Sequence, residues 1–266
     1  MDLPRLGFGT YGRTGPEGRD AILAALEIGY RHLDTAQTYD TEREVGEAVR
    51  LSGLPRDEVF VTTKVSEGNL GEGQVIPSLE RSLEASGLDH VDLALIHWPA
   101  RKGGPAPEVY LRQLSEAKAR GLARQIGVSN FTIALIEEAR SILGDGVILT
   151  NQVELNPWFR NRKLADHCMS RGIVVTCYEP LARGKVGADP VLQRIAARHR
   201  ATPEQVALAW ELAQGYAVIP TSRNPDRIAQ NFAAQDLALS SDELAEIDTL
   251  DRGIRSIDPD WGPVWD

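Results

Sequence analysis

Short apolar runs with strand character alternate with amphipathic stretches along almost the whole of this 266-residue chain. The strand-like runs are short and bounded by turn residues, and they fall at residues 6–9, 32–35, 59–65, 91–97, 125–128, 147–152, 173–177 and 217–219. Between the first two runs, Ile22, Ala25, Leu26 and Gly29 share one helical face, and comparable stripes follow the other runs. This alternation predicts an α/β fold in which parallel strands close into a (β/α)8 TIM barrel.

Several of the predicted helices carry start signals, in which a hydroxyl or amide side chain precedes a glutamate, a glutamine or a proline. These signals are Thr41 with Glu44, Thr202–Pro203 with Gln205, Asn224–Pro225, and Ser240 with Glu243. The last of them predicts an extra C-terminal helix, which an irregular segment at 258–266 follows. No linker or low-complexity tract interrupts the chain, so we expect residues 1–266 to form a single domain, close to the ~250 residues typical of such barrels.

The composition excludes several classes of protein. Apolar residues make up 42% of the chain and charged residues 25%, as in a water-soluble globular protein, and no apolar stretch approaches the ~20 residues that span a bilayer. The net charge of −9 disfavours nucleic acid as a partner. The first residues lack the layout of a signal peptide, so we expect a cytoplasmic protein in which Cys168 and Cys177 stay reduced. The expected partner is a small molecule.

The loop after the first predicted strand contains a glycine pattern with two interpretations. Residues 7–12, Gly-Phe-Gly-Thr-Tyr-Gly, match G-x-G-x-x-G, and Asp34 follows at about the spacing of a ribose-binding acid. In a dinucleotide-binding turn the last glycine lies inside the following helix, whereas here residues 13–16 intervene and we expect the helix to begin near Glu17. The pattern therefore indicates a turn at the barrel mouth rather than a Rossmann fold.

Four polar residues fall at or just beyond the carboxyl ends of three consecutive predicted strands, where barrel enzymes place their catalytic groups. Asp34 closes the second strand and Tyr39 follows it after a short loop, while Lys64 lies near the end of the third strand and His97 closes the fourth. Each has an ordinary alternative when taken singly: a salt bridge for Asp34 and Lys64, a loop aromatic for Tyr39 and a packed core histidine for His97. Their shared position predicts one site.

The chemistry that suits these four groups is the reduction of a carbonyl, in which an acid must protonate the oxygen as hydride reaches the carbon. A phenol with a pKa of about 10 is a poor acid at neutral pH, so we expect the ammonium of Lys64 to lower the pKa of Tyr39. Asp34 would keep Lys64 charged and oriented. A neutral His97 would donate a hydrogen bond to the substrate oxygen.

The motifs around these residues extend over essentially the whole chain. They are Leu-Gly-Phe-Gly-Thr at 6–10, Leu-Asp-Thr-Ala at 33–36 with Tyr39, Thr-Thr-Lys at 62–64, Leu-Ile-His-Trp-Pro at 95–99, Ile-Gly-Val-Ser-Asn-Phe at 126–131, Asn-Gln-Val-Glu at 151–154, and Ile-Pro at 219–220 with Ser222, Arg227 and Asn231. In this order they closely resemble the aldo-keto reductase family. The resemblance implies an α/β barrel, NADPH-dependent reduction of aldehydes and ketones, and a catalytic tetrad of Asp34, Tyr39, Lys64 and His97.

The same resemblance implies which residues bind the cofactor. Ser129, Asn130 and Gln152 would hydrogen-bond the nicotinamide carboxamide and Tyr178 would stack on the ring, although helix capping and aromatic packing are compatible alternatives. Residues 178–184 would cover the pyrophosphate, and the 2′-phosphate would lie at a helix N-terminus. The full set of expected cofactor residues is Thr10, Asp34, Ser129, Asn130, Gln152, Tyr178, Glu179, Leu181, Gly184, Thr221, Ser222, Arg223, Arg227, Gln230 and Asn231.

The expected 2′-phosphate site departs from the family pattern at two positions. Thr221 stands where the family usually has lysine, and Gln230 replaces the usual glutamate before Asn231. Arg223 and Arg227 can compensate, because a guanidinium binds phosphate through two hydrogen bonds. We therefore predict a preference for NADPH with some use of NADH.

The substrate pocket is expected between short mouth loops. Tyr39, His97, Tyr11 and Trp98 would contact the substrate, and Trp261 and Trp265 of the C-terminal segment would add to the wall. In length and short loops the chain most resembles the small bacterial diketogluconate reductase and methylglyoxal reductase branch of the family. This favours small dicarbonyls, aldehydes and keto sugars as substrates, and the relatives favour a monomer. Asn156 stands where relatives often carry histidine.

Two other functions fit part of the sequence. Lys64 near a strand end is compatible with a Schiff-base aldolase, and a nicotinamide-binding sensor or regulatory subunit with little turnover would keep the same fold. The separate cofactor-like segments argue against the aldolase, and intact Tyr39 and Lys64 argue against lost chemistry. No metal is expected, because the histidines and cysteines show no ligand spacing.

Overall fold

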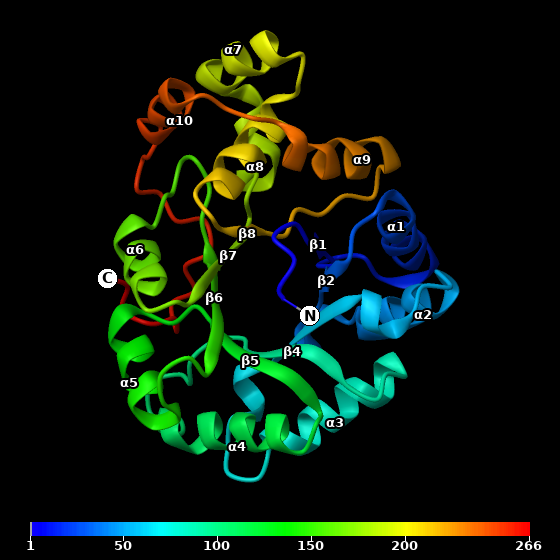
Figure 1. Ribbon diagram of the computed structural model, residues 1–266. Coiled ribbons are helices and arrows are strands. Elements are labelled where there is room, and N and C mark those ends of the chain that lie inside the picture. Colours follow the sequence, from blue (N-terminus) through cyan, green and yellow to red (C-terminus); the bar gives the residue numbers. More distant parts are fainter. Residues whose placement is uncertain (1) are drawn as a thin grey trace.

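Eight parallel strands form the centre of the computed structural model, which describes residues 2–266. Each strand pairs with the next one in sequence order, and helices surround the resulting ring (Figure 1). The strands are β1 (Phe8–Gly9), β2 (His32–Asp34), β3 (Phe60–Val65), β4 (Val91–Ile96), β5 (Ala123–Ser129), β6 (Ile148–Glu154), β7 (Val174–Tyr178) and β8 (Ala217–Val218).

The ring closes between the first and last strands, both of which are only two residues long. Leu6 pairs in parallel with Val218. The amide of Gly7 donates to the carbonyl oxygen of Val218 at 2.8 Å, and the amide of Gly9 donates to that of Pro220 at 3.0 Å. The predicted (β/α)8 barrel is therefore confirmed.

The helices follow the strands in the predicted alternation. The α-helices are α1 (Gly15–Ile28), α2 (Glu42–Leu51), α3 (Val75–Ser86), α4 (Pro107–Ala119), α5 (Ile133–Leu143), α6 (Arg162–Ser170), α7 (Pro190–His199), α8 (Pro203–Ala213), α9 (Pro225–Ala233) and α10 (Ser241–Asp248). Short 3-10 turns are η1 (Gln37–Tyr39), η2 (Arg56–Glu58), η3 (Glu67–Asn69), η4 (Ala182–Ala188) and η5 (Ala234–Asp236). The extra C-terminal helix predicted from Ser240 and Glu243 is α10, and the segment after it is irregular.

One helix start and one capping interaction differ from the sequence prediction. Helix α1 begins at Gly15 rather than near Glu17, yet Gly12 still lies outside the helix, unlike the last glycine of a dinucleotide-binding turn. The capping box predicted at Thr41 is wrong, because its hydroxyl bonds the hydroxyls of Thr10 at 2.9 Å and Thr35 at 2.8 Å instead of an α2 amide. These three threonines tie the ends of β1 and β2 to the start of α2. The boxes at Thr202 and Ser240 and the Asn224 cap are confirmed.

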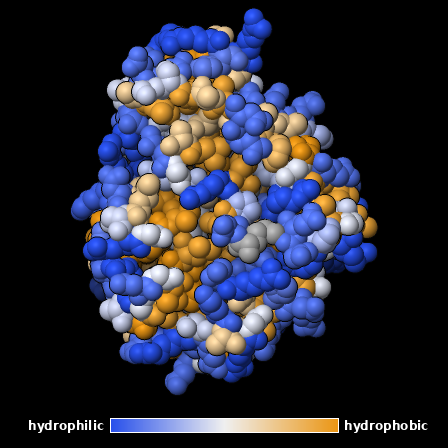
Figure 2. All heavy atoms as spheres, viewed as in Figure 1, coloured by the Kyte–Doolittle hydropathy of each residue, from blue (hydrophilic) through white to orange (hydrophobic). Residues whose placement is uncertain are grey.

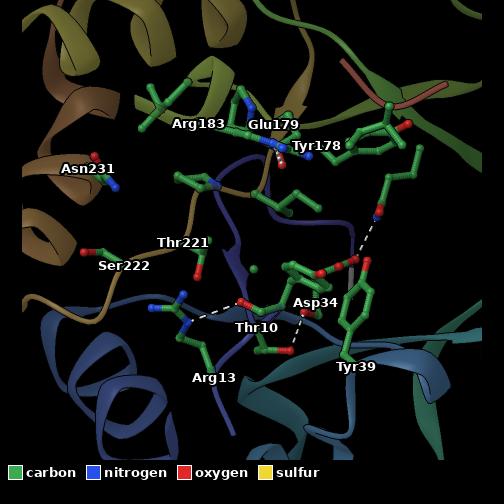
Figure 3. A pocket seen from close by; sticks show the side chains of 18 of the residues that line it. Thr10, Arg13, Asp34, Tyr39, Tyr178, Glu179, Arg183, Thr221, Ser222 and Asn231 are labelled. Atoms are coloured by element: carbon green, nitrogen blue, oxygen red, sulfur yellow. Dashed lines mark hydrogen bonds and ion pairs between the residues drawn. The ribbon is translucent and has the colours of Figure 1, made fainter. Parts of the chain in front are cut away.

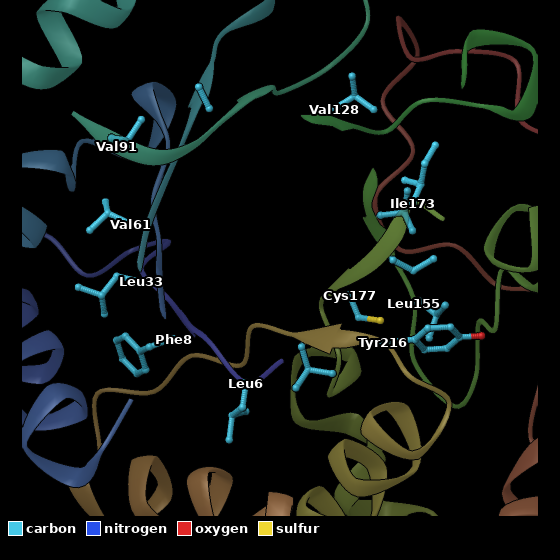
Figure 4. Close-up of a cluster of buried hydrophobic side chains, with 14 of the residues drawn as sticks. Leu6, Phe8, Leu33, Val61, Val91, Val128, Leu155, Ile173, Cys177 and Tyr216 are labelled. Carbon is cyan, nitrogen blue, oxygen red and sulfur yellow. The ribbon is translucent and has the colours of Figure 1, made fainter. Parts of the chain in front are cut away.

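Alternation along each strand sends one set of side chains into the barrel and the other toward the helices. In β3, Val61 and Val65 pack in the large cluster between the sheet and the helices, whereas Phe60 joins a small cluster with Leu93 inside the barrel. Figure 4 shows members of the large cluster, among them Leu33 and Val61, around the ring. Because Lys64 shares its face with Phe60, the strand directs its side chain inward.

Figure 2 shows hydrophilic residues over most of the rim, with hydrophobic residues gathered toward the middle of this face. Within the part of the chain that the structure describes, no helix has the length and apolar character needed to cross a membrane. Both cysteines are buried and unbridged.

Candidate active site

The carboxyl ends of the strands surround a cavity of about 970 Å³. Its wall contains every residue that the sequence analysis assigned to cofactor or substrate, from Thr10 and Tyr11 to Gln230 and Asn231, except the two tryptophans of the C-terminal segment (Figure 3). Of the four predicted catalytic residues, Asp34, Tyr39 and His97 line the cavity. Lys64 does not, because its side chain is 0% exposed and lies behind the cavity wall.

The position of Tyr39 is determined by the η1 turn, which follows β2. The side chain of Gln37 fixes this turn to its neighbours: its amide nitrogen donates to the backbone oxygen of Ser78 and to Ser82 Oγ, each at 3.1 Å. Its amide oxygen accepts from the backbone nitrogen of Ser66 at 2.9 Å. Gln37 therefore ties the turn to α3 and to the end of β3, and it was not singled out by the sequence analysis.

Lys64 connects the buried acid Asp34 to the phenol of Tyr39. Its Nζ donates to Asp34 Oδ1 at 2.5 Å, to the backbone oxygen of Thr35 at 3.0 Å and to the Tyr39 hydroxyl at 3.2 Å. The other carboxylate oxygen of Asp34 accepts from Gln152 Nε2 at 2.7 Å. All three ammonium hydrogens thus have acceptors, which a buried charge requires.

Lys64 lowers the pKa of Tyr39, as the sequence predicts, but the net shift of this pKa is upward. Burial raises the pKa of Tyr39, and the charge of Lys64 and its hydrogen bond only partly offset that effect. Burial alone would lower the pKa of Lys64, but Asp34 and Tyr39 outweigh burial and raise it. Tyr39 therefore stays protonated and Lys64 stays charged at neutral pH, so the pair holds a proton donor beside a cation.

His97 lies beside Tyr39 as a neutral imidazole. Burial, followed by the charge of Lys64, lowers the pKa of His97 to about 3. Its ring centroid is 5.5 Å from that of Tyr39, and its Nδ1 is 3.3 Å from Thr38 Oγ1. In the tautomer in which Nδ1 accepts from the Thr38 hydroxyl, Nε2 carries the proton and can donate into the cavity.

The residues expected around the nicotinamide form one connected network. Asn130 has a left-handed backbone, with φ of 62°, and its Nδ2 donates to the His97 backbone oxygen at 3.0 Å and to Ser129 Oγ at 3.1 Å. The hydroxyl of Tyr178 donates to Asn130 Oδ1 at 2.8 Å, which holds the aromatic ring in place. The amide nitrogen of Gln152 binds Asp34 rather than pointing freely into the cavity.

The loops after β7 and β8 form the other end of the cavity. After β7, Glu179, Ala182 and Arg183 adopt positive φ angles, and Glu179, Leu181, Arg183 and Gly184 all line the cavity. After β8, the expected residues Thr221, Ser222, Arg223, Arg227, Gln230 and Asn231 line it as well. Asn224 caps α9 by accepting from the Arg227 amide at 3.0 Å, as its sequence predicts.

The substrate side differs from the prediction at two tryptophans. Trp98 lines the cavity, but Trp261 and Trp265 do not; they pack edge-on against Trp98, with ring centroids at 5.2 Å and 6.0 Å. The C-terminal segment instead contributes Ile257. Tyr11 is exposed at the mouth and packs edge-on against Tyr39.

A buried carboxylate holds that C-terminal segment in place. Glu154, at the end of β6, is fully buried, and its two oxygens accept from the backbone amides of Ser256 and Ile257, each at 2.8 Å. Sequence reasoning missed Ile257, because its contact depends on the path of an irregular segment. It also missed Arg13, although a cation in the loop after a barrel strand was a usable signal.

Asn156 has a local structural role. Its side-chain oxygen accepts from the backbone amides of Trp158 at 3.0 Å and Phe159 at 3.2 Å, which forms a tight turn after β6. The Schiff-base alternative for Lys64 is not favoured, because this amine is buried, charged and fully hydrogen-bonded.

Comparisons with known proteins give one consistent result. The sequence model of the aldo/keto reductase family matches residues 5–252. A methylglyoxal reductase DkgB from Salmonella typhimurium is 45% identical over 267 residues, which cover 100% of both chains. The corresponding protein of Escherichia coli O157:H7 is 44% identical over the same length.

Solved structures agree with the sequence comparisons. A structure named for a 2,5-diketo-D-gluconic acid reductase B superposes with a TM-score of 0.95 at 40% identity, covering 99% of this chain and 94% of the other. The aldose reductase of Schistosoma japonicum superposes with a TM-score of 0.91 at 32% identity, covering 97% and 91%.

Proposed function

Because the chain belongs to the aldo/keto reductase family, we propose that it reduces small dicarbonyls, aldehydes and keto sugars to alcohols with NADPH. Family membership makes the protein an oxidoreductase that acts on carbonyl or alcohol groups. The observation that carries the finer proposal is the Tyr39 hydroxyl, which faces the cavity within 3.2 Å of a buried, charged Lys64.

Proton delivery to the substrate oxygen is the task of Tyr39. Its raised pKa keeps the proton on the hydroxyl until a stronger base forms, and the oxygen of a carbonyl becomes such a base as hydride arrives. The ammonium of Lys64 then stabilises the phenolate that remains, and Asp34 holds that ammonium in place. His97, through Nε2, donates a hydrogen bond to the same oxygen and so orients the carbonyl.

The cavity fits an elongated dinucleotide that is anionic away from its reactive ring. One part of its wall carries Tyr39 and His97, and another carries Arg223 and Arg227 near the N-terminus of α9. In Figure 3, Tyr39 and Ser222 lie on opposite sides of the view. NADPH supplies the hydride when bound. Tyr178, whose hydroxyl is held by Asn130, presents a fixed ring for stacking, while Ser129 and Gln152 place polar groups beside it.

The substrate class is inferred from the relatives and from the short mouth loops. Two of the similar proteins are named for the reduction of methylglyoxal and of 2,5-diketo-D-gluconate, which are small dicarbonyl compounds. Between β4 and α4 the loop covers only residues 97–106, and it adds Trp98 to the cavity wall. A short loop leaves room for a polar substrate beside Tyr39 and His97.

We further expect a preference for NADPH with some use of NADH, because Thr221 offers no charge to the 2′-phosphate. Comparison of kcat/KM for the two cofactors tests this, and a preference for NADH would contradict it. We also expect a monomer, which size-exclusion chromatography with light scattering tests.

The decisive experiment measures NADPH consumption over a panel of small carbonyls with the wild type and Tyr39→Phe. Loss of a general acid should lower kcat by about 10²- to 10⁴-fold, while NADPH affinity stays nearly unchanged. Tyr216→Phe is the matched control, because this tyrosine lies outside the cavity wall. Undiminished turnover in Tyr39→Phe would show that Tyr39 is not the proton donor. A wild type inactive toward every dicarbonyl would refute the substrate class.

A further inference from the structure

Three arginines line the part of the cavity formed by the β1–α1 loop and by the segment after β8. Arg13 belongs to the loop between β1 and α1, Arg223 to the loop after β8, and Arg227 to the first turn of α9; all three line the cavity. Figure 3 shows the Arg13 side chain extending from the first loop toward the segment of Thr221 and Ser222. Two separate loops therefore bring cations to one place.

The two loops are joined directly by a hydrogen bond. Arg223 Nη2 donates to the backbone oxygen of Gly12 at 2.6 Å, and Gly12 is the neighbour of Arg13. Arg13 Nε donates to the backbone oxygen of Tyr11 at 3.3 Å, and Arg227 Nε donates to Ser222 Oγ at 3.4 Å. These bonds fix the guanidinium groups with neutral acceptors and leave their positive charge uncompensated.

No acid in the described part of the chain neutralises this cluster. Within residues 2–266, no carboxylate oxygen lies within 4.0 Å of the guanidinium nitrogens of Arg13, Arg223 or Arg227. Glu44, which reaches the β1–α1 loop, accepts from the Gly15 amide at 2.8 Å. Burial, followed by the charge of Arg223, lowers the pKa of Arg13, which shows that these two cations disfavour each other.

Like charges held together without a counter-ion are unfavourable unless an anion binds between them. The Thr221 side chain is uncharged, so the β8–α9 segment brings cations to this part of the cavity only through Arg223 and Arg227. We propose that Arg13 is a specificity-determining residue that contacts the 2′-phosphate of NADPH from the β1–α1 loop, which neighbours the segment that leads into α9. This inference rests on the proposed use of NADPH, and it assigns to Arg13 the charge that Thr221 does not provide.

Arg13 suits a terminal phosphate, because a guanidinium can bind two phosphate oxygens at once. The pyrophosphate is the other anion that the cavity would hold, and the loop with Glu179, Arg183 and Gly184 is the candidate for that group. NADP⁺ and NAD⁺ share the pyrophosphate and differ only in the 2′-phosphate. Binding of these two molecules therefore separates the two assignments without any turnover.

The test compares the wild type with Arg13→Met, which keeps most of the aliphatic stem and removes the charge. Isothermal titration calorimetry with NADP⁺ and NAD⁺ gives the dissociation constants, and thermal melting checks the fold. We expect Arg13→Met to weaken NADP⁺ binding by about tenfold, as for loss of one charge-assisted hydrogen bond, and NAD⁺ binding by less than about twofold. The matched control is Arg81→Met, an exposed arginine of α3 outside the cavity wall, which should change neither constant.

A second variant tests the placement of the charge. In Arg13→Met with Thr221→Lys, a new ammonium on the neighbouring β8–α9 segment should restore most of the lost NADP⁺ affinity. Unchanged NADP⁺ binding in Arg13→Met, equal weakening of NADP⁺ and NAD⁺, or absence of restoration by Thr221→Lys would each overturn the inference while leaving the reductase assignment intact. A wild type that binds NADP⁺ and NAD⁺ equally well would instead refute the proposed NADPH preference, and this inference with it.

Discussion

Removal of one charge from the Asp34–Lys64 pair should destabilise the barrel strongly, and removal of both should not. The side chains are 1% and 0% exposed, and the Nζ to Oδ1 distance is 2.5 Å. Asp34→Asn preserves shape but leaves the ammonium without its counter-charge. Lys64→Met preserves length but leaves the carboxylate with one strong donor, Gln152 Nε2 at 2.7 Å. The double variant removes both charges.

The structure sets the size of the effect. At 2.5 Å, with an effective dielectric constant of about 20, the gross attraction between the two charges is ~7 kcal/mol. Desolvation of two ions cancels much of this, so the net value of the pair is small, but a single unpaired buried ion costs about 3–5 kcal/mol. We expect each single variant to lose about that much free energy of unfolding, and the double variant to lose no more than either single one. The coupling energy is then at least about 3 kcal/mol.

Urea denaturation at pH 7 measures this cycle, because urea does not screen charges as guanidinium does. Tryptophan fluorescence and far-UV circular dichroism should report the same transition, as a two-state analysis requires. The matched control is the surface pair Glu108–Arg112, whose side chains are 58% and 64% exposed. Its cycle, with Glu108→Gln and Arg112→Met, should give a coupling below about 0.5 kcal/mol. A coupling for Asp34 and Lys64 as small as that of the surface pair would refute the reasoning.

Two further predictions concern His97 and the C-terminal segment. Folding lowers the pKa of His97 to about 3 from about 6.5 in the unfolded chain, so the unfolded state binds the extra proton between these values. The difference in free energy of unfolding between the wild type and His97→Gln should therefore be largest above about pH 6.5 and shrink as the pH falls toward 3. A difference that does not change with pH would contradict the lowered pKa of His97. Glu154→Gln should remove one of the two hydrogen bonds from Glu154 to the backbone of the C-terminal segment, which lowers the local stability of the segment by about 1–3 kcal/mol. We expect faster tryptic cleavage at Arg252 and Arg255 and a higher KM for the carbonyl substrate. Equal cleavage rates in wild type and variant would show that Glu154 does not hold the segment.

Local patterns predicted the elements of this barrel correctly, because helices and strands impose their own spacing on apolar residues. The alternation in β3 places Phe60 and Lys64 on the inner face and Val61 on the outer one. Asp34, Lys64 and His97 lie at successive strand ends, and parallel strands must bring those ends to one rim. The shared site of these residues was therefore accessible without coordinates.

Predictions of side-chain contacts failed where residues remote in sequence offered an alternative contact. Thr41 has the sequence of a cap, but the hydroxyls of Thr10 and Thr35 lie closer to its own than an α2 amide does. Trp261 and Trp265 belong to an irregular segment with no period, and they pack behind Trp98 rather than in the cavity wall. These contacts depend on distances between segments that are remote in sequence.

The active-site quartet shows both contributions. The sequence alone indicated that Asp34, Lys64 and His97 meet at the mouth of a barrel, because strand order and side-chain alternation bring these strand ends together, whereas the position of Tyr39 depends on the η1 turn that Gln37 holds. Only the tertiary structure decided their ionisation: burial raises the pKa of Tyr39 despite the nearby ammonium, and it makes His97 neutral. Desolvation depends on every atom packed around a group, so a pKa shift of this kind cannot be obtained from the residues of one segment. The approach of Arg13 to Arg223 likewise depends on two loops that are remote in sequence.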